Sequence, residues 1–138
     1  MISMKMYVSV TDGRHDIIWD HLIGKVEGDT RKQMFVNAIR TFQKLRASEK
    51  IKTQIRQKSF PAFSKWEFML TNGSSPVDKI VGKTVYWVRR KDNDWIILEL
   101  NKDWKPSDGL WKTVYFPIYK IPNSKVNHSS AKDFMVKL

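Results

Sequence analysis

In the first half of the chain, apolar and polar residues alternate with two different periods. One is a period of two residues, and the other has steps of three and four residues. Residues 5–10 alternate polar and apolar side chains, which predicts a strand ended by the turn residues 11–13. Five apolar residues then recur at steps of three and four, which predicts a helix over about residues 14–23 with its end marked by glycine. They are Ile18, Trp19, Leu22, Ile23 and Val26, followed by Gly24 and Gly28 at the expected helix end.

A second helix is predicted to start at Thr30, because Thr30 and Gln33 have the spacing of a capping box. Apolar residues continue from there at helical spacing, at Phe35, Ala38, Ile39, Phe42 and Leu45. The phase of this stripe changes beyond Leu45. We therefore expect a bend near Ser48, with Ser48 capping a shorter third helix that ends at about residue 58.

The second half of the chain reads as strands, because Pro61 disfavours further helix and β-branched and aromatic residues follow. We expect strands over residues 66–70, 84–90, 95–101 and 111–121, with residues 91–94 as a hairpin loop. Pro117 interrupts the last strand and is best tolerated at a sheet edge or a bulge. The predicted fold class is α+β, with two or three N-terminal helices packed on one face of a mainly antiparallel four- to five-stranded sheet.

Pairing across residues 91–94 divides the hairpin side chains into two faces. Arg90 is expected opposite Trp95, Val88 opposite Ile97, and Tyr86 opposite Glu99. The more aliphatic face is assigned to the core and the mixed face to solvent. The predicted core face holds Val85, Trp87, Ile96, Leu98, Leu100, Val114, Phe116 and Ile118, and the predicted exposed face holds Tyr86, Arg90, Trp95, Glu99, Tyr115 and Tyr119.

Length and composition indicate one folded domain over residues 1–138, with a loosely packed tail at residues 124–138. The sequence has no cysteine, which favours a reducing compartment, and we expect a cytoplasmic protein. No stretch approaches the roughly 20 apolar residues that span a bilayer, so no membrane partner is expected. His15, His21, Asp16 and Asp20 lack a distal third ligand, and we expect neither a metal nor a cofactor.

Charge is the strongest functional signal. The formal net charge is +11, and residues 31–58 hold nine Lys and Arg against one acid, Glu49. Basic pairs four residues apart repel each other on a helix, and phosphates are the usual counter-charge for such a stripe. We therefore expect nucleic acid, with flat rings on the sheet favouring RNA or single-stranded DNA. The expected binding residues are Arg40, Lys44, Arg46, Lys50, Lys52, Arg56, Tyr86, Arg90, Trp95 and Tyr115.

Two other functions fit the same residues. The first is an interaction protein or inhibitor that binds an acidic protein surface or blocks a nucleic-acid-handling enzyme. The second is a metal-independent endoribonuclease, with Glu99 as general base, Arg90 stabilising the phosphorane and His128 as the candidate acid. Helices followed by a four-stranded antiparallel sheet broadly resemble the small ribonucleases and RelE-type toxins in topology. The sequence leaves oligomeric state and base preference open.

Overall fold

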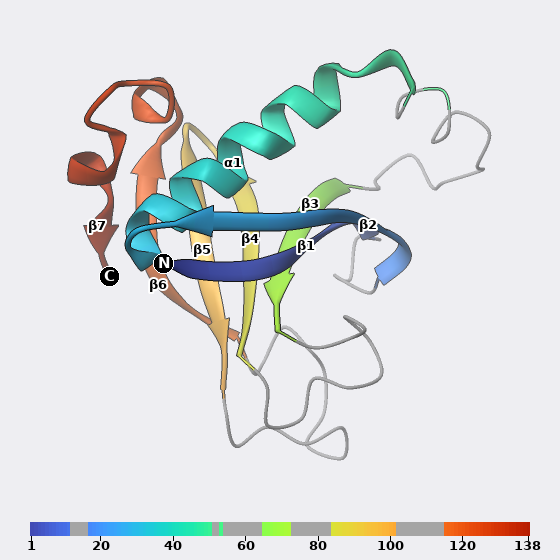
Figure 1. Cartoon of the computed structure of the whole chain (residues 1–138), viewed down its shortest axis with the longest axis horizontal. Helices are drawn as coiled ribbons and strands as arrows, with labels where there is room; N and C mark the ends of the chain where they lie inside the picture. Colours follow the sequence, from blue (N-terminus) through green and yellow to red (C-terminus); the bar gives the residue numbers. More distant parts are fainter. Residues whose placement is uncertain (12–16, 51–52, 54–64, 73–83, 102–114) are drawn as a thin grey trace.

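The structure, a computed structural model, describes residues 1–11, 17–50, 53, 65–72, 84–101 and 115–138. These residues form one antiparallel sheet of seven strands and one complete α-helix, α1, which lies across one face of the sheet (Figure 1). The strand order is β2-β1-β3-β4-β5-β6-β7. The elements in chain order are β1 (Ile2–Thr11), β2 (Ile17–Gly28), α1 (Arg31–Ala47), β3 (Lys65–Thr71), β4 (Val85–Lys91), β5 (Asp94–Leu100), β6 (Tyr115–Pro122), two 3-10 turns (Asn123–Lys125 and Ala131–Phe134) and β7 (Val136–Lys137).

The predicted fold class is wrong in its balance of helices and strands. The described residues contain one complete helix instead of two or three, and seven strands instead of four or five. The topological resemblance to RelE-type toxins rested on two or three helices followed by a four-stranded sheet, and the described residues do not have that arrangement. Glu49 and Lys50 of the expected third helix are helical, and most of the rest of that segment lies outside the described residues.

Residues 17–23 of the helix predicted over about residues 14–23 form a strand in the structure, and residues 14–16 lie outside the described residues. β2 pairs antiparallel with β1 from Ile2 opposite Gly28 to Thr11 opposite Ile17. The pairing shifts register where Met6 lies opposite Gly24 and Tyr7 opposite Leu22, so one extra residue bulges from β2, and Gly24 has a φ of 141°. Both glycines that were expected to end a helix therefore lie in strand β2. The apolar spacing suited either structure, and pairing with β1 decided between them.

α1 begins where the sequence predicts. Thr30 is the N-cap, and its side-chain oxygen accepts the Gln33 amide at 3.1 Å, a contact worth about 1 kcal/mol. Gly28 allows the helix start to approach the sheet, because a Cβ at this position would lie 2.3 Å from the Met34 nitrogen. Phe35 and Phe42 are almost fully buried, and each contributes about 1.5–3 kcal/mol through loss of water contact.

The β4–β5 hairpin has the predicted register. Arg90 lies opposite Trp95, Val88 opposite Ile97, and Tyr86 opposite Glu99. The strands extend one pair further than expected, to Lys91 and Asp94, so that Asp92 and Asn93 alone form the loop. Asp92 has a φ of 55°, a left-handed conformation that aspartate tolerates better than most residues.

The face predicted to be core is buried, but the assignment of the other hairpin face to solvent is wrong. α1 packs on the face that was predicted to be exposed. The ring centroids of Phe35 and Tyr86 lie 4.8 Å apart, and those of Phe42 and Trp95 lie 5.8 Å apart. Tyr86 and Trp95 are 4% and 2% exposed. The opposite face holds a second buried cluster, Met69, Val85, Trp87, Leu98 and Leu100, in which the Trp87 indole donates to the Glu67 carboxylate. Both faces are apolar, so alternation alone could not identify the helix side.

β6 changes faces at Pro117, as expected for a proline at a bulge. Leu98 lies opposite Pro117 and Ile97 opposite Tyr119, so Ile118 is the extra residue. Tyr115 therefore packs on the second cluster, with its ring centroid 5.6 Å from that of Trp87. Tyr119 packs on the α1 side. Phe116 is 48% exposed, contrary to its predicted core position.

The C-terminal segment belongs to the α1-side core. Val126, Ala131 and Met135 are buried there, and Leu138 donates its amide to the Ile118 carbonyl at 2.9 Å. Figure 1 shows β7 and the C-terminus beside β6. No helix in the described part of the chain is both long and apolar enough to cross a membrane.

Candidate nucleic-acid interface

The C-terminal half of α1 borders two adjoining hollows that share Gln43 and Ala47. One, of about 480 Å³, is lined by Gln43, Arg46, Ala47, Arg90, Trp95 and Asn123. The other, of about 500 Å³, is lined by Arg40, Gln43, Lys44, Ala47 and Asn127. Their four cations, Arg40, Lys44, Arg46 and Arg90, are called the α1 basic patch below. They come from the helix and from the β4–β5 hairpin, with amide side chains from the segment after β6.

Stacking on tryptophan positions two of the cations. The Arg46 guanidinium lies 5.6 Å from the centroid of the Trp66 ring, and the Arg90 guanidinium lies 5.3 Å from that of Trp95. Arg90 also donates to the Asp92 carbonyl at 3.0 Å. These contacts hold the aliphatic stems against the protein while both side chains stay exposed to solvent.

Arg40 has a structural role as well. Its Nε donates to the Val126 carbonyl and its NH2 to the His128 carbonyl, both at 2.9 Å, which ties α1 to the C-terminal segment. One terminal nitrogen of its guanidinium has no acceptor in the described residues. Arg40 therefore both orders one wall of the patch and contributes charge to it.

Side-chain amides lie between the cations. Asn123 Oδ1 accepts from the Trp95 indole at 3.0 Å and from Gln43 Nε2 at 3.4 Å, which leaves its NH2 group without an acceptor in the described part of the chain. Asn127 is exposed at the rim of the second hollow. Amide donors beside guanidinium groups suit phosphate oxygens, which accept hydrogen bonds from both.

Within the described residues, no cation of the α1 basic patch forms an ion pair with Asp or Glu. Lys44 and Arg46 lie in the last turn of α1, where a cation also stabilises the helix dipole. That effect explains two of the four charges. It does not explain Arg90, which the hairpin brings to the same hollow as Arg46.

The predicted binding residues fall into three groups. Arg40, Lys44, Arg46 and Arg90 come together, and Trp95 lines the patch although it is almost wholly buried. The expectation that Tyr86, Trp95 and Tyr115 present exposed rings is wrong, because the first two are buried under α1 and Tyr115 packs on Trp87. Lys50 is exposed and follows Ser48, the C-cap residue of α1, in the sequence. Lys52 and Arg56 lie outside the described residues.

The candidate catalytic residues do not form one site. Glu99 lies opposite Tyr86 and Arg90 opposite Trp95, four residues apart along the hairpin, which is about 13 Å at the usual rise of a strand. His128 is exposed, accepts the Ser130 amide at Nδ1, and stacks edge-on against Phe134. In the described residues no group of three His, Cys, Asp or Glu side chains could hold a metal ion.

Sequence reasoning missed the amides of the patch, Gln43, Asn123 and Asn127. Gln43 follows Phe42 in the predicted helix, but the segment that it meets is 80 residues further along the chain. No local pattern marks such a contact. The sequence indicated the cations of the basic helix and, from the hairpin, Arg90 and Trp95, but not these amides.

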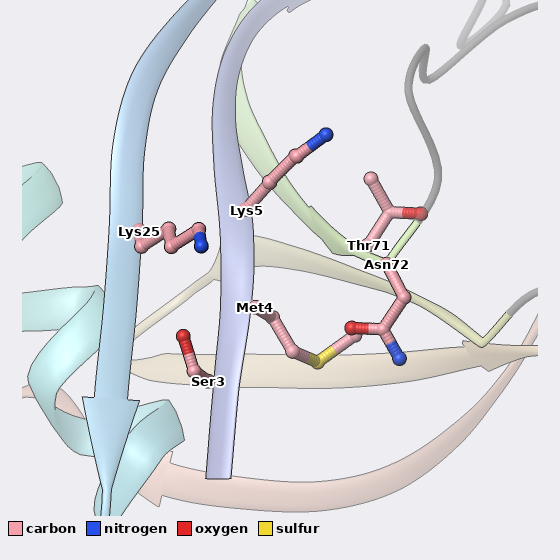
Figure 2. Close-up of a pocket in the computed structure, with 6 residues that line it drawn as sticks. All are labelled: Ser3, Met4, Lys5, Lys25, Thr71 and Asn72. Carbon is pink, nitrogen blue, oxygen red and sulfur yellow. The ribbon is translucent and has the colours of Figure 1, made fainter.

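A smaller basic hollow lies at the other side of the molecule. Figure 2 shows Lys5 and Lys25 on the neighbouring strands β1 and β2, with Thr71 and Asn72 at the end of β3. The two lysines are direct cross-strand partners, a like-charged pair that weakens the hairpin slightly. The hollow measures about 250 Å³ and has two cations against the four of the α1 basic patch.

Comparisons of the chain with protein-family models, with curated proteins and with solved structures found no match.

Proposed function

We propose that the protein binds nucleic acid, and that the α1 basic patch contacts the phosphate backbone. The observation that carries the proposal is the convergence of Arg40, Lys44, Arg46 and Arg90 on two adjoining hollows, without an acidic partner in the described residues. A chain with a net charge of +11 would attract a polyanion over long range.

We also propose a cytoplasmic location, which the absence of cysteine supports.

The proposed binding is mainly electrostatic. Guanidinium, ammonium and amide donors suit phosphates, and most contacts of this kind carry no base sequence information. The burial of Tyr86 and Trp95 removes the stacking rings that favoured unpaired strands. We therefore propose backbone binding, with RNA, single-stranded DNA and duplex DNA as separate arms of the test.

An acidic protein surface is the competing partner. Guanidinium groups bind carboxylates as well as phosphates, so the cations alone do not distinguish them. The amide groups of Gln43 and Asn123 beside Arg46 can donate to either group, whereas the net charge of +11 favours a polyanion over a single acidic side chain. The proposal does not include catalysis, because Glu99 and Arg90 are separated along the hairpin.

The test is a titration of labelled single-stranded RNA, single-stranded DNA and duplex DNA at two or more salt concentrations. In the double variant Lys44→Gln/Arg46→Gln we expect affinity to fall about tenfold, from two exposed ion contacts of about 0.7 kcal/mol each. The slope of log K against log salt should flatten by about 1.4 to 1.8, because two phosphate contacts are lost.

The matched control is Lys120→Gln/Lys132→Gln, which removes the same charge from two exposed lysines that line neither hollow. It should keep most of the affinity. An equal loss in both double variants would mean that net charge alone matters and would contradict the assigned interface. Absence of a salt-dependent affinity for any of the three nucleic acids would contradict nucleic-acid binding and favour an acidic protein partner.

A further inference from the structure

The opposite end of α1 carries a different cluster, centred on Arg31. Its NH1 donates to the Tyr86 hydroxyl at 3.2 Å and its NH2 to the Tyr119 hydroxyl at 3.3 Å. The guanidinium carbon also lies 5.9 Å and 5.5 Å from the two ring centroids. Arg31 is thus held between two phenols from β4 and β6 at the first residue of the helix.

Both phenols are left with a proton to donate. Tyr86 and Tyr119 are 4% and 8% exposed, and each hydroxyl oxygen already accepts from Arg31. In the described residues, neither hydroxyl proton has an acceptor. Each hydroxyl can therefore donate a hydrogen bond to a ligand beside Arg31 while it accepts one from the guanidinium.

The charge around Tyr119 is positive. The Lys32 ammonium lies 5.7 Å from the centroid of its ring, and Lys137 of β7 is its direct cross-strand partner. The hydrogen bond from Arg31, helped by the nearby lysines, lowers the pKa of Tyr119 below its usual value. Glu99 lies opposite Tyr86 in the ladder, but no described carboxylate forms an ion pair with Arg31, Lys32 or Lys137.

The helix start supplies further donors. Thr30 satisfies the Gln33 amide, whereas the amides of Arg31 and Lys32 have no acceptor among the described residues. Each terminal nitrogen of Arg31 also keeps a second N–H, because each makes one bond to a phenol. Backbone amides at a helix start and a fork of guanidinium donors both suit a tetrahedral anion.

We propose that Arg31, Lys32 and Lys137, with the hydroxyls of Tyr86 and Tyr119, form a binding site for a phosphate monoester dianion. Three cations then face one ligand of charge about −2. The site is separate from the α1 basic patch, because Arg31 and Lys44 are about 20 Å apart along the helix axis. It does not depend on nucleic-acid binding at that patch. The ligand is either free phosphate or nucleotide, or the terminal phosphate of a strand.

The first experiment titrates the whole protein with inorganic phosphate at pH 7.5 and follows the backbone amides of residues 31 and 32 by NMR. We expect saturable shifts, and an affinity about tenfold weaker in Tyr119→Phe, which keeps the ring but loses the hydroxyl. Lys32→Gln is a second variant, which removes one of the three cations and should also weaken phosphate binding. Saturation with no change in either variant, or shifts that never saturate, would overturn the site.

The matched control is Lys44→Gln/Arg46→Gln, which leaves the Arg31 cluster intact. The phosphate-dependent shifts of residues 31 and 32 should keep the wild-type affinity in this variant, although it weakens phosphate binding at the α1 basic patch. This control also keeps the two proposals distinguishable, since it impairs only the α1 basic patch. Equal weakening of phosphate binding at residues 31 and 32 in this control and in Tyr119→Phe would overturn the site, because it would show a diffuse charge effect.

A second experiment separates the two sources of phosphate. Oligonucleotides with a 5′-phosphate and with a 5′-hydroxyl are compared for binding to the wild type and to Tyr119→Phe. A preference of about tenfold for the phosphorylated end that disappears in the variant would assign the site to strand ends. Equal binding of the two oligonucleotides, together with saturable inorganic phosphate, would assign it to free phosphate or a nucleotide.

Discussion

At the residue scale, two tyrosines of one strand have opposite environments. Tyr115 packs on the second cluster, and burial raises the pKa of its phenol. Tyr119, beyond the bulge, accepts a hydrogen bond from Arg31, which lowers the pKa of its phenol. The extra residue at Ile118 produces this difference by exchanging the faces of β6.

The two phenols should give opposite dependences of stability on pH. Tyr119 loses its proton in the folded protein below pH 10, the value in the unfolded chain, so its contribution should be complete above pH 10 and lost as pH falls through the folded value. Relative to Tyr119→Phe, the wild type should therefore gain unfolding free energy as pH rises from 8 to 10. Urea denaturation at several pH values measures this difference.

Tyr115 should act in the opposite direction. Its folded pKa is raised, so it stabilises the fold below pH 10 and loses this contribution as pH rises further. Tyr115→Phe should therefore reduce the alkaline loss of stability above pH 10. If both variants changed the pH profile in the same direction, the assigned environments of the two hydroxyls would be wrong.

At the element scale, local patterns predicted the ladder of β4 and β5 but not its faces. The register followed from alternation and a short loop. The helix side was set by Phe35 and Phe42, which pack on Tyr86 and Trp95 from more than 40 residues away in the chain. The error at β2 has a similar cause, because its apolar spacing fits a helix until pairing with β1 is known.

The hairpin loop offers a test at this scale. Asp92 adopts a φ of 55°, and a β-branched residue there would add strain of about 1–2 kcal/mol. Asp92→Val should therefore lower the free energy of unfolding by about that amount. Asp92→Asn is the control, because it removes the charge and keeps a side chain that tolerates this conformation, and it should stay within about 0.5 kcal/mol. Equal losses in both variants would assign the effect to charge.

At the scale of the whole molecule, the central strands β3, β4 and β5 are buried on both faces, and the C-terminal segment packs on the α1 side. The cations of α1 could be predicted from the sequence, and they supply most of the candidate interface. The position of Asn123 and Asn127 could not, because it depends on how the segment after β6 meets α1. Arg40 makes that connection through two backbone carbonyls.

Arg40→Met should show the structural part of that role. Two charge-assisted hydrogen bonds at a partly exposed site are lost, and we expect the free energy of unfolding to fall by about 1–2 kcal/mol. Hydrogen exchange should quicken at residues 131–135, with little change in β1. Lys44→Met, one turn further along α1 and exposed, is the control. Unchanged exchange at residues 131–135 in Arg40→Met would contradict the connection.

The bulge beside Gly24 interrupts the pairing edge of β2. β2 is the outer strand at one end of the sheet, and a strand of 12 residues in that position offers a long row of backbone groups to a neighbouring chain. The extra residue and the positive φ of Gly24 break that row in the middle. Because a second copy could follow it for only part of its length, we expect the irregularity to hinder fibre growth in concentrated solution.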